Sequence, residues 1–141
     1  MPARAAPSPF EAPESHCMAK SRPKHLNLFQ IKLPIPAVVS ILHRISGAGL
    51  FLMLPFLLYL LQASLESPSS YILFRALLSN VMVKLLLLGL LWAFLHHFCA
   101  GIRYLLLDVH VGTALAPARA SSFAVIGVSL VLTVVFGVWL W

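Results

Sequence analysis

The sequence predicts an all-α membrane protein with three transmembrane helices, and three observations support this fold class. Hydrophobic residues make up 60% of the 141 residues and charged residues only 10%, which leaves too little polar surface to cover a water-soluble globule. The chain contains three long apolar stretches, and about 20 mostly apolar residues are enough to span a bilayer as a helix. The remaining segments are too short to form a catalytic domain, so any soluble chemistry must come from partner chains.

The first element is an N-terminal arm, residues 1–36, which is basic and carries seven of the ten prolines. Such a segment cannot bury a hydrophobic core and is expected to be an extended cytoplasmic arm. Residues 1–17 lack the apolar run of a secretory signal and are expected to be disordered or to precede a true start at Met18.

The membrane anchor follows as residues 37–141, with predicted spans at 37–63, 80–107 and 122–141. Between the spans, residues 65–79 are expected to face outward, and residues 108–120 are expected to be a cytoplasmic loop.

The distribution of Lys and Arg predicts the orientation of these spans. Eight basic residues lie on the side of the N-terminus and the second loop, whereas only Arg75 and Lys84 lie on the other side. The eight are Arg4, Lys20, Arg22, Lys24, Lys32, Arg44, Arg103 and Arg119. By the positive-inside rule, the N-terminus is cytoplasmic and the C-terminus faces outward. The net charge of +6 is therefore explained by topology and contact with lipid headgroups, and nucleic acid is not an expected partner.

The second span contains the first group of candidate site residues. At 100° per residue, His97 shares a helical stripe with Ala93, Gly101, Tyr104 and Asp108. The small residues leave a hollow beside the imidazole, and an ionisable side chain inside a membrane span is a candidate functional residue. Close helix packing is the alternative explanation for Gly101 taken alone. An imidazole with open space on its face suits an axial ligand of haem iron.

The adjacent His96 points about 100° away from this stripe and shares a face with Trp92, Ala100 and Arg103. Only one of the two histidines can therefore be the ligand of a haem on the stripe. His97 lies about 15 Å of helix rise from the cytoplasmic end of its span, which places the site in the cytoplasmic half of the bilayer.

The start of the first span contains the second group. Ser40, His43, Arg44 and Gly47 have the spacing i, i+3, i+4 and i+7 and line one helix face at the cytoplasmic interface. An arginine and a histidine can pair with haem propionates, and a serine hydroxyl can bond a quinone carbonyl. Snorkelling to the headgroups would explain Arg44 alone, but it does not explain four polar or small residues on one face.

The two groups together resemble a known family. Arg22-Pro23 with His25-Leu26, then Ser40-Ile-Leu-His43-Arg44-Ile-Ser46-Gly47, and then His97-x-x-x-Gly101-Ile-Arg103-x-x-x-x-Asp108 occur in this order. These motifs, at the ends of the right spans of a three-helix chain, resemble the cytochrome b subunits of bacterial succinate dehydrogenases. The resemblance covers residues 22–141.

The resemblance implies a membrane anchor of respiratory complex II that forms part of a heteromeric helical bundle in the bacterial inner membrane. With a second small three-helix anchor subunit, it would hold a flavoprotein subunit and an iron–sulfur subunit, and the complex would oxidise succinate and reduce ubiquinone. The flavoprotein site is not in this chain, so the chain alone has no complete active site.

The resemblance also implies roles for individual residues. His97 would be one axial ligand of haem b, with the other histidine donated by the companion subunit. Ser40 and Arg44 would line the quinone site, and His43 with Arg44 would contact the haem propionates. Gly101 and Tyr104 would line the haem face. Some relatives have a histidine in place of Tyr104, and tyrosine does not normally titrate near neutral pH, so a proton-linked role at this position is not expected here.

Two alternative functions share parts of this pattern. A haem-free or differently directed anchor of a fumarate reductase would have the same architecture, but it would leave the intramembrane histidine unexplained. A small proton-coupled transporter also has this size, but that class normally needs a carboxylate within the membrane. Here Glu66 and Asp108 lie outside the spans or at their ends.

Overall fold

The computed structural model describes residues 32–140, which form four α-helices and no strand. They are α1 (Ile35–Leu65), α2 (Pro68–Ser79), α3 (Val81–Asp108) and α4 (Leu115–Leu140). The all-α prediction is confirmed. The predicted arm lies outside the described residues up to residue 31, and so does Trp141.

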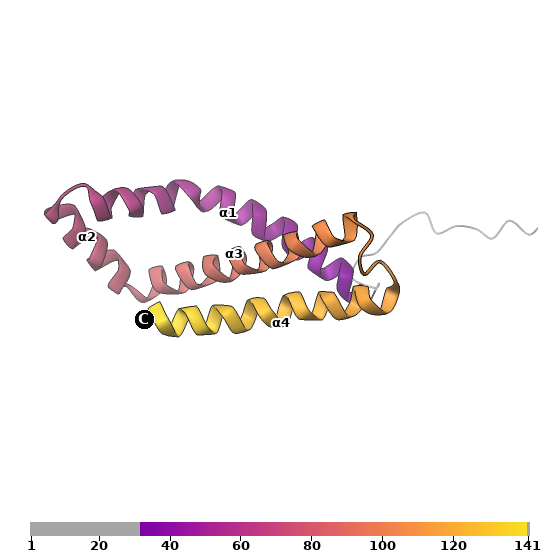
Figure 1. Cartoon of the computed structure of the whole chain (residues 1–141). Helices are drawn as coiled ribbons and strands as arrows, with labels where there is room; N and C mark the ends of the chain where they lie inside the picture. Colours follow the sequence, from indigo (N-terminus) through magenta and orange to yellow (C-terminus); the bar gives the residue numbers. More distant parts are fainter. Residues whose placement is uncertain (1–31, 141) are drawn as a thin grey trace, which may run out of the picture. The chain divides into compact units, whose positions relative to one another are not determined.

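The three long helices alternate in direction, and α2 connects the end of α1 to the start of α3 (Figure 1). α3 packs against both α1 and α4. Each of the three long helices is long and apolar enough to cross a membrane, as predicted. The chain is therefore a multi-pass membrane protein.

Most of the segment 65–79 between the first two predicted spans forms the helix α2. Ser67 is its N-cap: its hydroxyl accepts the backbone N–H of Ser70, and the Ser70 hydroxyl accepts the backbone N–H of Ser67. Pro68 occupies the first helical position, where a missing N–H costs nothing. This reciprocal capping box was present in the sequence, but the prediction relied on apolar length and overlooked it.

The predicted loop 108–120 is shorter than expected, because α4 begins at Leu115. Pro117 lies in the first turn of α4, where proline is tolerated since the first N–H groups of a helix have no partner within it. The chain reverses after α3 through His110, which has a positive φ of 63°. The N–H groups of His110 and Val111 donate to the carbonyls of Leu107 and Leu106, which is the Schellman arrangement that ends a helix.

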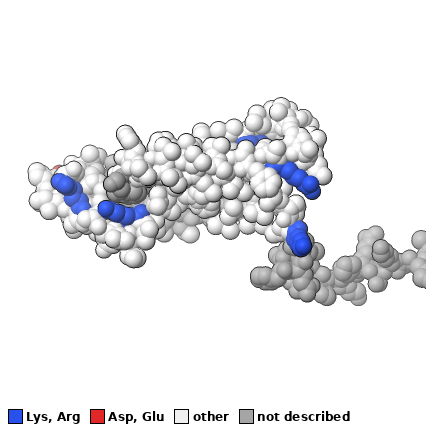
Figure 2. Space-filling view, turned by 90° about the horizontal axis from the view of Figure 1, so that it is seen from below, with Lys and Arg blue, Asp and Glu red and all other residues white. Residues whose placement is uncertain are grey.

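Much of the surface is apolar. On the face shown in Figure 2, Lys and Arg gather toward the two ends of the helices, and the surface between them carries neither positive nor negative side chains. Among the described residues, six hydrophobic side chains are buried, and three of them, Val39, Ala100 and Val125, pack together as one cluster. Lipid is the expected environment of such a middle zone.

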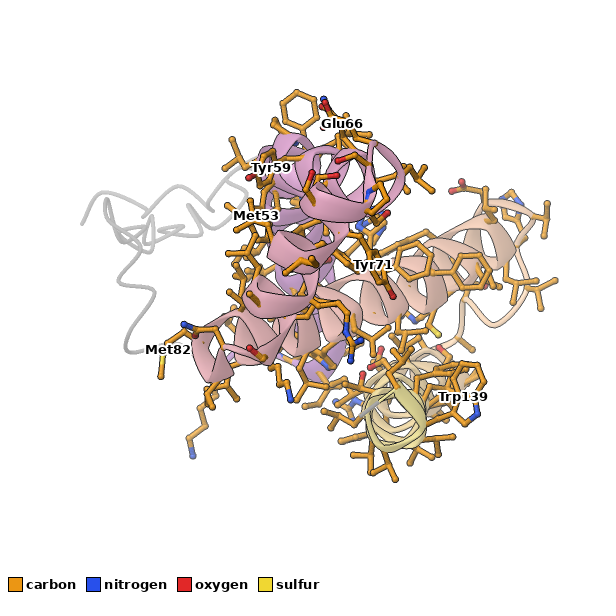
Figure 3. The ribbon with its side chains drawn as sticks, turned by 90° about the vertical axis from the view of Figure 1, so that its left-hand side faces the viewer. Met53, Tyr59, Glu66, Tyr71, Met82 and Trp139 are labelled. Atoms are coloured by element: carbon orange, nitrogen blue, oxygen red, sulfur yellow. The ribbon has the colours of Figure 1, made fainter. Side chains whose placement is uncertain are left out.

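Aromatic side chains mark the end of the molecule that carries α2. Trp139 is 80% exposed, Tyr59 is 49% exposed and Tyr71 is 46% exposed. Seen from this end, Tyr59 and Trp139 project on different sides of the bundle (Figure 3). Exposed Trp and Tyr at the end of a set of spans are typical of the membrane–water interface.

Candidate functional site

The candidate site lies where α1 passes α3, and its centre is a pair of histidines. The rings of His43 on α1 and His97 on α3 are stacked, with centroids 4.2 Å apart and an angle of 12° between their planes. The Tyr104 ring lies 5.2 Å from the His43 ring at an angle of 52°. The structure thus brings together three predicted site residues from two separate motifs.

The hydrogen bonds of His97 assign its tautomer. Its Nδ1 lies 3.1 Å from the backbone carbonyl oxygen of His43 and 3.4 Å from the Ser46 hydroxyl. The Ser46 hydroxyl itself donates to the same His43 carbonyl at 3.0 Å. Because a carbonyl only accepts, Nδ1 carries the hydrogen and Nε2 keeps a lone pair.

The Nε2 atom of His97 is the free end of this imidazole. Among the described residues it has no hydrogen-bond partner, and it is not one of the fully buried polar atoms that lack a partner. The described residues therefore do not wholly enclose this nitrogen. A histidine held through Nδ1 by a carbonyl, with Nε2 open, is the arrangement in which proteins present imidazole to a metal.

The glycine that makes room for the His97 ring is Gly47 on the neighbouring helix. A Cβ atom on Gly47 would lie 2.7 Å from the His97 Cε1 atom, whereas one on Gly89 would meet nothing within 4 Å. The space beside Gly101 is occupied by His43, whose Nε2 would lie 3.9 Å from an added Cβ. The predicted hollow between small residues of the second span is therefore filled from α1, because the spacing within one helix does not show what packs against it.

The four residues predicted to share one face at the start of the first span lie in two different environments. His43 and Gly47 face His97, whereas Arg44 is exposed and Ser40 is half-buried. Consecutive positions 43 and 44 lie 100° apart on a helix, so both cannot face α3. Among the described residues, neither the Ser40 hydroxyl nor the Arg44 guanidinium forms a side-chain hydrogen bond or ion pair.

His96 has surroundings of its own, as its predicted angular position requires. It is fully buried and its ring stacks on Trp92, with centroids 5.4 Å apart. Both of its ring nitrogens lack a hydrogen-bond partner among the described residues, as does the Tyr104 hydroxyl. The sequence separated His96 from His97 correctly but did not indicate that His96 would be buried.

Arg103 is a buried cation that joins α3 to α4, a contact that the sequence did not predict. Only 6% of its surface is exposed. Its Nε donates to the Ser121 hydroxyl at 3.0 Å and its Nη2 donates to the Ala118 carbonyl at 3.2 Å. Its guanidinium also lies 5.4 Å from the centre of the Tyr104 ring. Arg103 thus fixes α4 beside the helix that carries the site.

Two other observations bear on the ligands that the site could hold. Within residues 32–140, no three His, Cys, Asp or Glu side chains converge as a metal site would require. An apolar cavity of about 440 Å³ near α2 is lined by leucines and one phenylalanine and offers no polar side chain. Its lining is Leu50, Leu57, Leu78, Leu87, Leu90, Leu91, Phe94 and Leu140.

The fold and the site together define a multi-pass α-helical membrane protein with a stacked histidine pair at a helix contact. The chain belongs to the family of succinate dehydrogenase/fumarate reductase transmembrane subunits, which it matches over residues 18–136. This is the family indicated by the two sequence motifs.

Individual relatives agree with this assignment. The chain is 40% identical over 125 residues to a succinate dehydrogenase cytochrome b556 subunit of Coxiella burnetii, covering 88% of this chain and 100% of the relative. It is 32% identical over 114 residues to a protein of the same description from Paracoccus denitrificans, covering 81% and 88% of the two chains. A third such subunit, from Rickettsia felis, is 30% identical over 114 residues, covering 81% and 87%.

Proposed function

We propose that this chain is the haem-binding membrane anchor of a succinate dehydrogenase, in which His97 is one axial ligand of haem b. The observation that carries the proposal is the state of the His97 imidazole: Nδ1 is held by the His43 carbonyl and Nε2 is open. The description of three relatives as cytochrome b556 subunits supports the choice of haem b.

The residues present fit this group. An axial histidine needs a neutral imidazole with a free nitrogen, and hydrogen bonding of the other nitrogen fixes its orientation. His97 meets both conditions. The described residues place one histidine in this arrangement, so we assign the second axial ligand to a histidine of the companion anchor subunit. Gly101 and Tyr104 lie on the same side of α3 and would line the haem face. The Tyr104 hydroxyl is buried and has no hydrogen-bond partner among the described residues.

The side chains around His97 have complementary tasks in this proposal. Haem supplies a store for one electron close to the site of quinone reduction. His43 and Arg44 are the cations or donors that would neutralise the haem propionates, because charge-assisted hydrogen bonds of this type hold carboxylates strongly. His43 contacts His97 directly, and the exposed Arg44 side chain is long enough to turn toward a ligand beside α1.

Ser40 and Arg44 form the part of the quinone site that this chain would contribute. They lie one turn apart on α1, and both offer donors that have no partner within the described residues. A hydroxyl and a guanidinium bonded to a quinone carbonyl stabilise the negative charge that develops on its oxygen as it is reduced. Conversion of quinone to quinol takes up two electrons and two protons, and the electrons would come from the iron–sulfur subunit.

We base the proposed orientation, membrane and partner subunits on the positions of the charged residues and on the family. The end of the helices with Arg44 and Arg119 would face the cytoplasm, where the iron–sulfur and flavoprotein subunits would dock. The end with α2 and the exposed aromatic residues would face the periplasm. The membrane would be the bacterial inner membrane, and ubiquinone would be the electron acceptor.

The test is a reduced-minus-oxidised absorption spectrum of the detergent-purified complex, expressed with all its subunits. His97→Ala should lose the b-type band or shift it, because an axial nitrogen is removed. His110→Asn is the matched control, since His110 is exposed beyond α3 and asparagine tolerates its positive φ. An unchanged band and reduction potential in His97→Ala would assign the ligand to another residue.

A further inference from the structure

Gly47 is in closer contact with the His97 ring than any side chain larger than hydrogen would allow. A Cβ atom at this position would lie 2.7 Å from Cε1, 3.1 Å from Nδ1 and 3.8 Å from Nε2 of His97. These three atoms belong to one rigid ring, so they cannot move apart as the end of a flexible chain would. An alanine at position 47 therefore requires the whole imidazole, or the helix that carries it, to move.

The ring has little freedom to make this movement. Its Nδ1 is bonded to the His43 carbonyl at 3.1 Å, and its face is stacked on the His43 ring. Both contacts come from α1, one turn before Gly47. Displacing the ring from Gly47 would lengthen the Nδ1 hydrogen bond or separate the stacked pair.

We infer that Gly47 is a positioning residue for the proposed haem ligand. Its missing side chain lets the α1 backbone lie against the His97 imidazole, so that the His43 carbonyl holds Nδ1–H and Nε2 points away as the coordinating nitrogen. Ser46 is also buried and donates to the same carbonyl. His43, Ser46 and Gly47 together hold the His97 ring in place. The inference rests on the proposed function, because it gives a role to the nitrogen that would bind iron.

General helix packing does not account for this contact. Glycines that serve only close approach of helices meet backbone or aliphatic atoms of the neighbour. The three nearest atoms to an added Cβ at Gly47 all belong to the imidazole of His97. Gly49, two residues further along the same helix, would meet nothing within 4 Å and shows that α1 does not need glycine throughout.

The contact also has an expected effect on a bound metal. A hydrogen bond from the second ring nitrogen to a carbonyl raises the basicity of a ligating histidine, and such outer contacts typically change metal affinity or activity by about 10–100-fold. A more basic ligand favours the oxidised iron. Weakening the Nδ1 hydrogen bond should therefore raise the haem reduction potential and weaken haem retention.

The first experiment compares Gly47→Ala with Gly49→Ala in the complete purified complex. Gly47→Ala should lower the affinity for haem by about 10-fold or more, the size expected for an outer contact of a metal ligand. The haem that remains should have a higher reduction potential and an altered low-spin EPR signal. Gly49→Ala should match the wild type. Equal potentials, EPR signals and haem contents in both variants would overturn the inference.

The second experiment tests the contact between Gly47 and the His97 ring in the absence of haem. The melting midpoint of the complex, prepared from haem-deficient cells, is measured for Gly47→Ala, His97→Ala and the double variant. Gly47→Ala should lower the midpoint when His97 is present and have little effect in the His97→Ala background, because the missing ring leaves space for the new methyl group. Equal destabilisation in both backgrounds would show a packing role that does not act through His97.

The two experiments separate the inference from the function on which it rests. Unchanged haem binding in His97→Ala would overturn the proposed ligand, and the melting cycle would still decide whether Gly47 positions His97. Loss of haem in His97→Ala with a normal spectrum in Gly47→Ala would keep the proposed ligand and overturn the positioning role.

Discussion

Replacing Arg103 tests how strongly α4 is held beside the helix that carries the site. Arg103→Met keeps most of the aliphatic stem but removes both hydrogen bonds, to the Ser121 hydroxyl and to the Ala118 carbonyl. Only 6% of the Arg103 surface is exposed, so water cannot replace these bonds without opening the helix contact. We therefore expect a loss of stability rather than a neutral change.

The size of the effect follows from two bounds. Hydrogen bonds to a charged group contribute about 1.5–3 kcal/mol each in soluble proteins. Interhelical hydrogen bonds measured inside membranes average about 0.6 kcal/mol. Two bonds at a buried position give an expected loss of about 2 kcal/mol, between these bounds. If the contact breaks before the rate-limiting step of unfolding, this loss speeds thermal inactivation by about 30-fold.

The assay is the half-life of the detergent-purified complex at one elevated temperature, with succinate–quinone reductase activity as the readout. Arg119→Met is the matched control, because Arg119 is an exposed arginine on α4 and should leave the half-life unchanged. Arg103→Lys should resemble Arg103→Met, since an ammonium cannot reproduce the forked contacts of a guanidinium. A half-life of Arg103→Met within about twofold of the wild type would refute this account of the α3–α4 contact.

Two further substitutions test the N-cap of α2 and the role of the His43 ring. Ser67→Ala removes the N-cap of α2 and should destabilise that helix by about 1 kcal/mol. The measurement is amide hydrogen exchange across Pro68–Ser79, which should become faster. Exchange rates equal to those of the wild type would show that α2 does not depend on its cap. His43→Ala removes the stacked ring but keeps the backbone carbonyl that holds His97 Nδ1, so haem should still bind while its reduction potential falls with the loss of a propionate donor. Complete loss of haem in His43→Ala would show that the ring, and not the carbonyl, holds the ligand in place.

The sequence by itself determined the fold class and the chemistry available to the site. Long apolar stretches interrupted by polar connections require membrane-spanning helices, because the backbone must satisfy its own hydrogen bonds in lipid. Helical spacing also placed His97 on a different face from His96, and the structure agrees. These properties are local: they depend on composition and on the 3.6-residue period of one helix.

Helix ends were less predictable, although the signals were present. The capping box at Ser67 and Ser70 begins the helix α2 in a segment where apolar length predicted no span. The start of α4 lies before Pro117, because a proline within the first turn of a helix does not interrupt it. Hydrophobic length marks the middle of a span but does not mark where a helix begins.

Only the tertiary structure decided which groups surround the candidate ligand. The Nδ1 of His97 and its carbonyl partner at His43 are 54 residues apart in the chain, and Gly47 meets the same ring from the same helix. Arg103 likewise finds its partners on α4 rather than near the end of its own helix. Such contacts depend on the register at which two helices pack. That register is set by the side chains of both helices together, and the periodicity of either helix alone does not contain it.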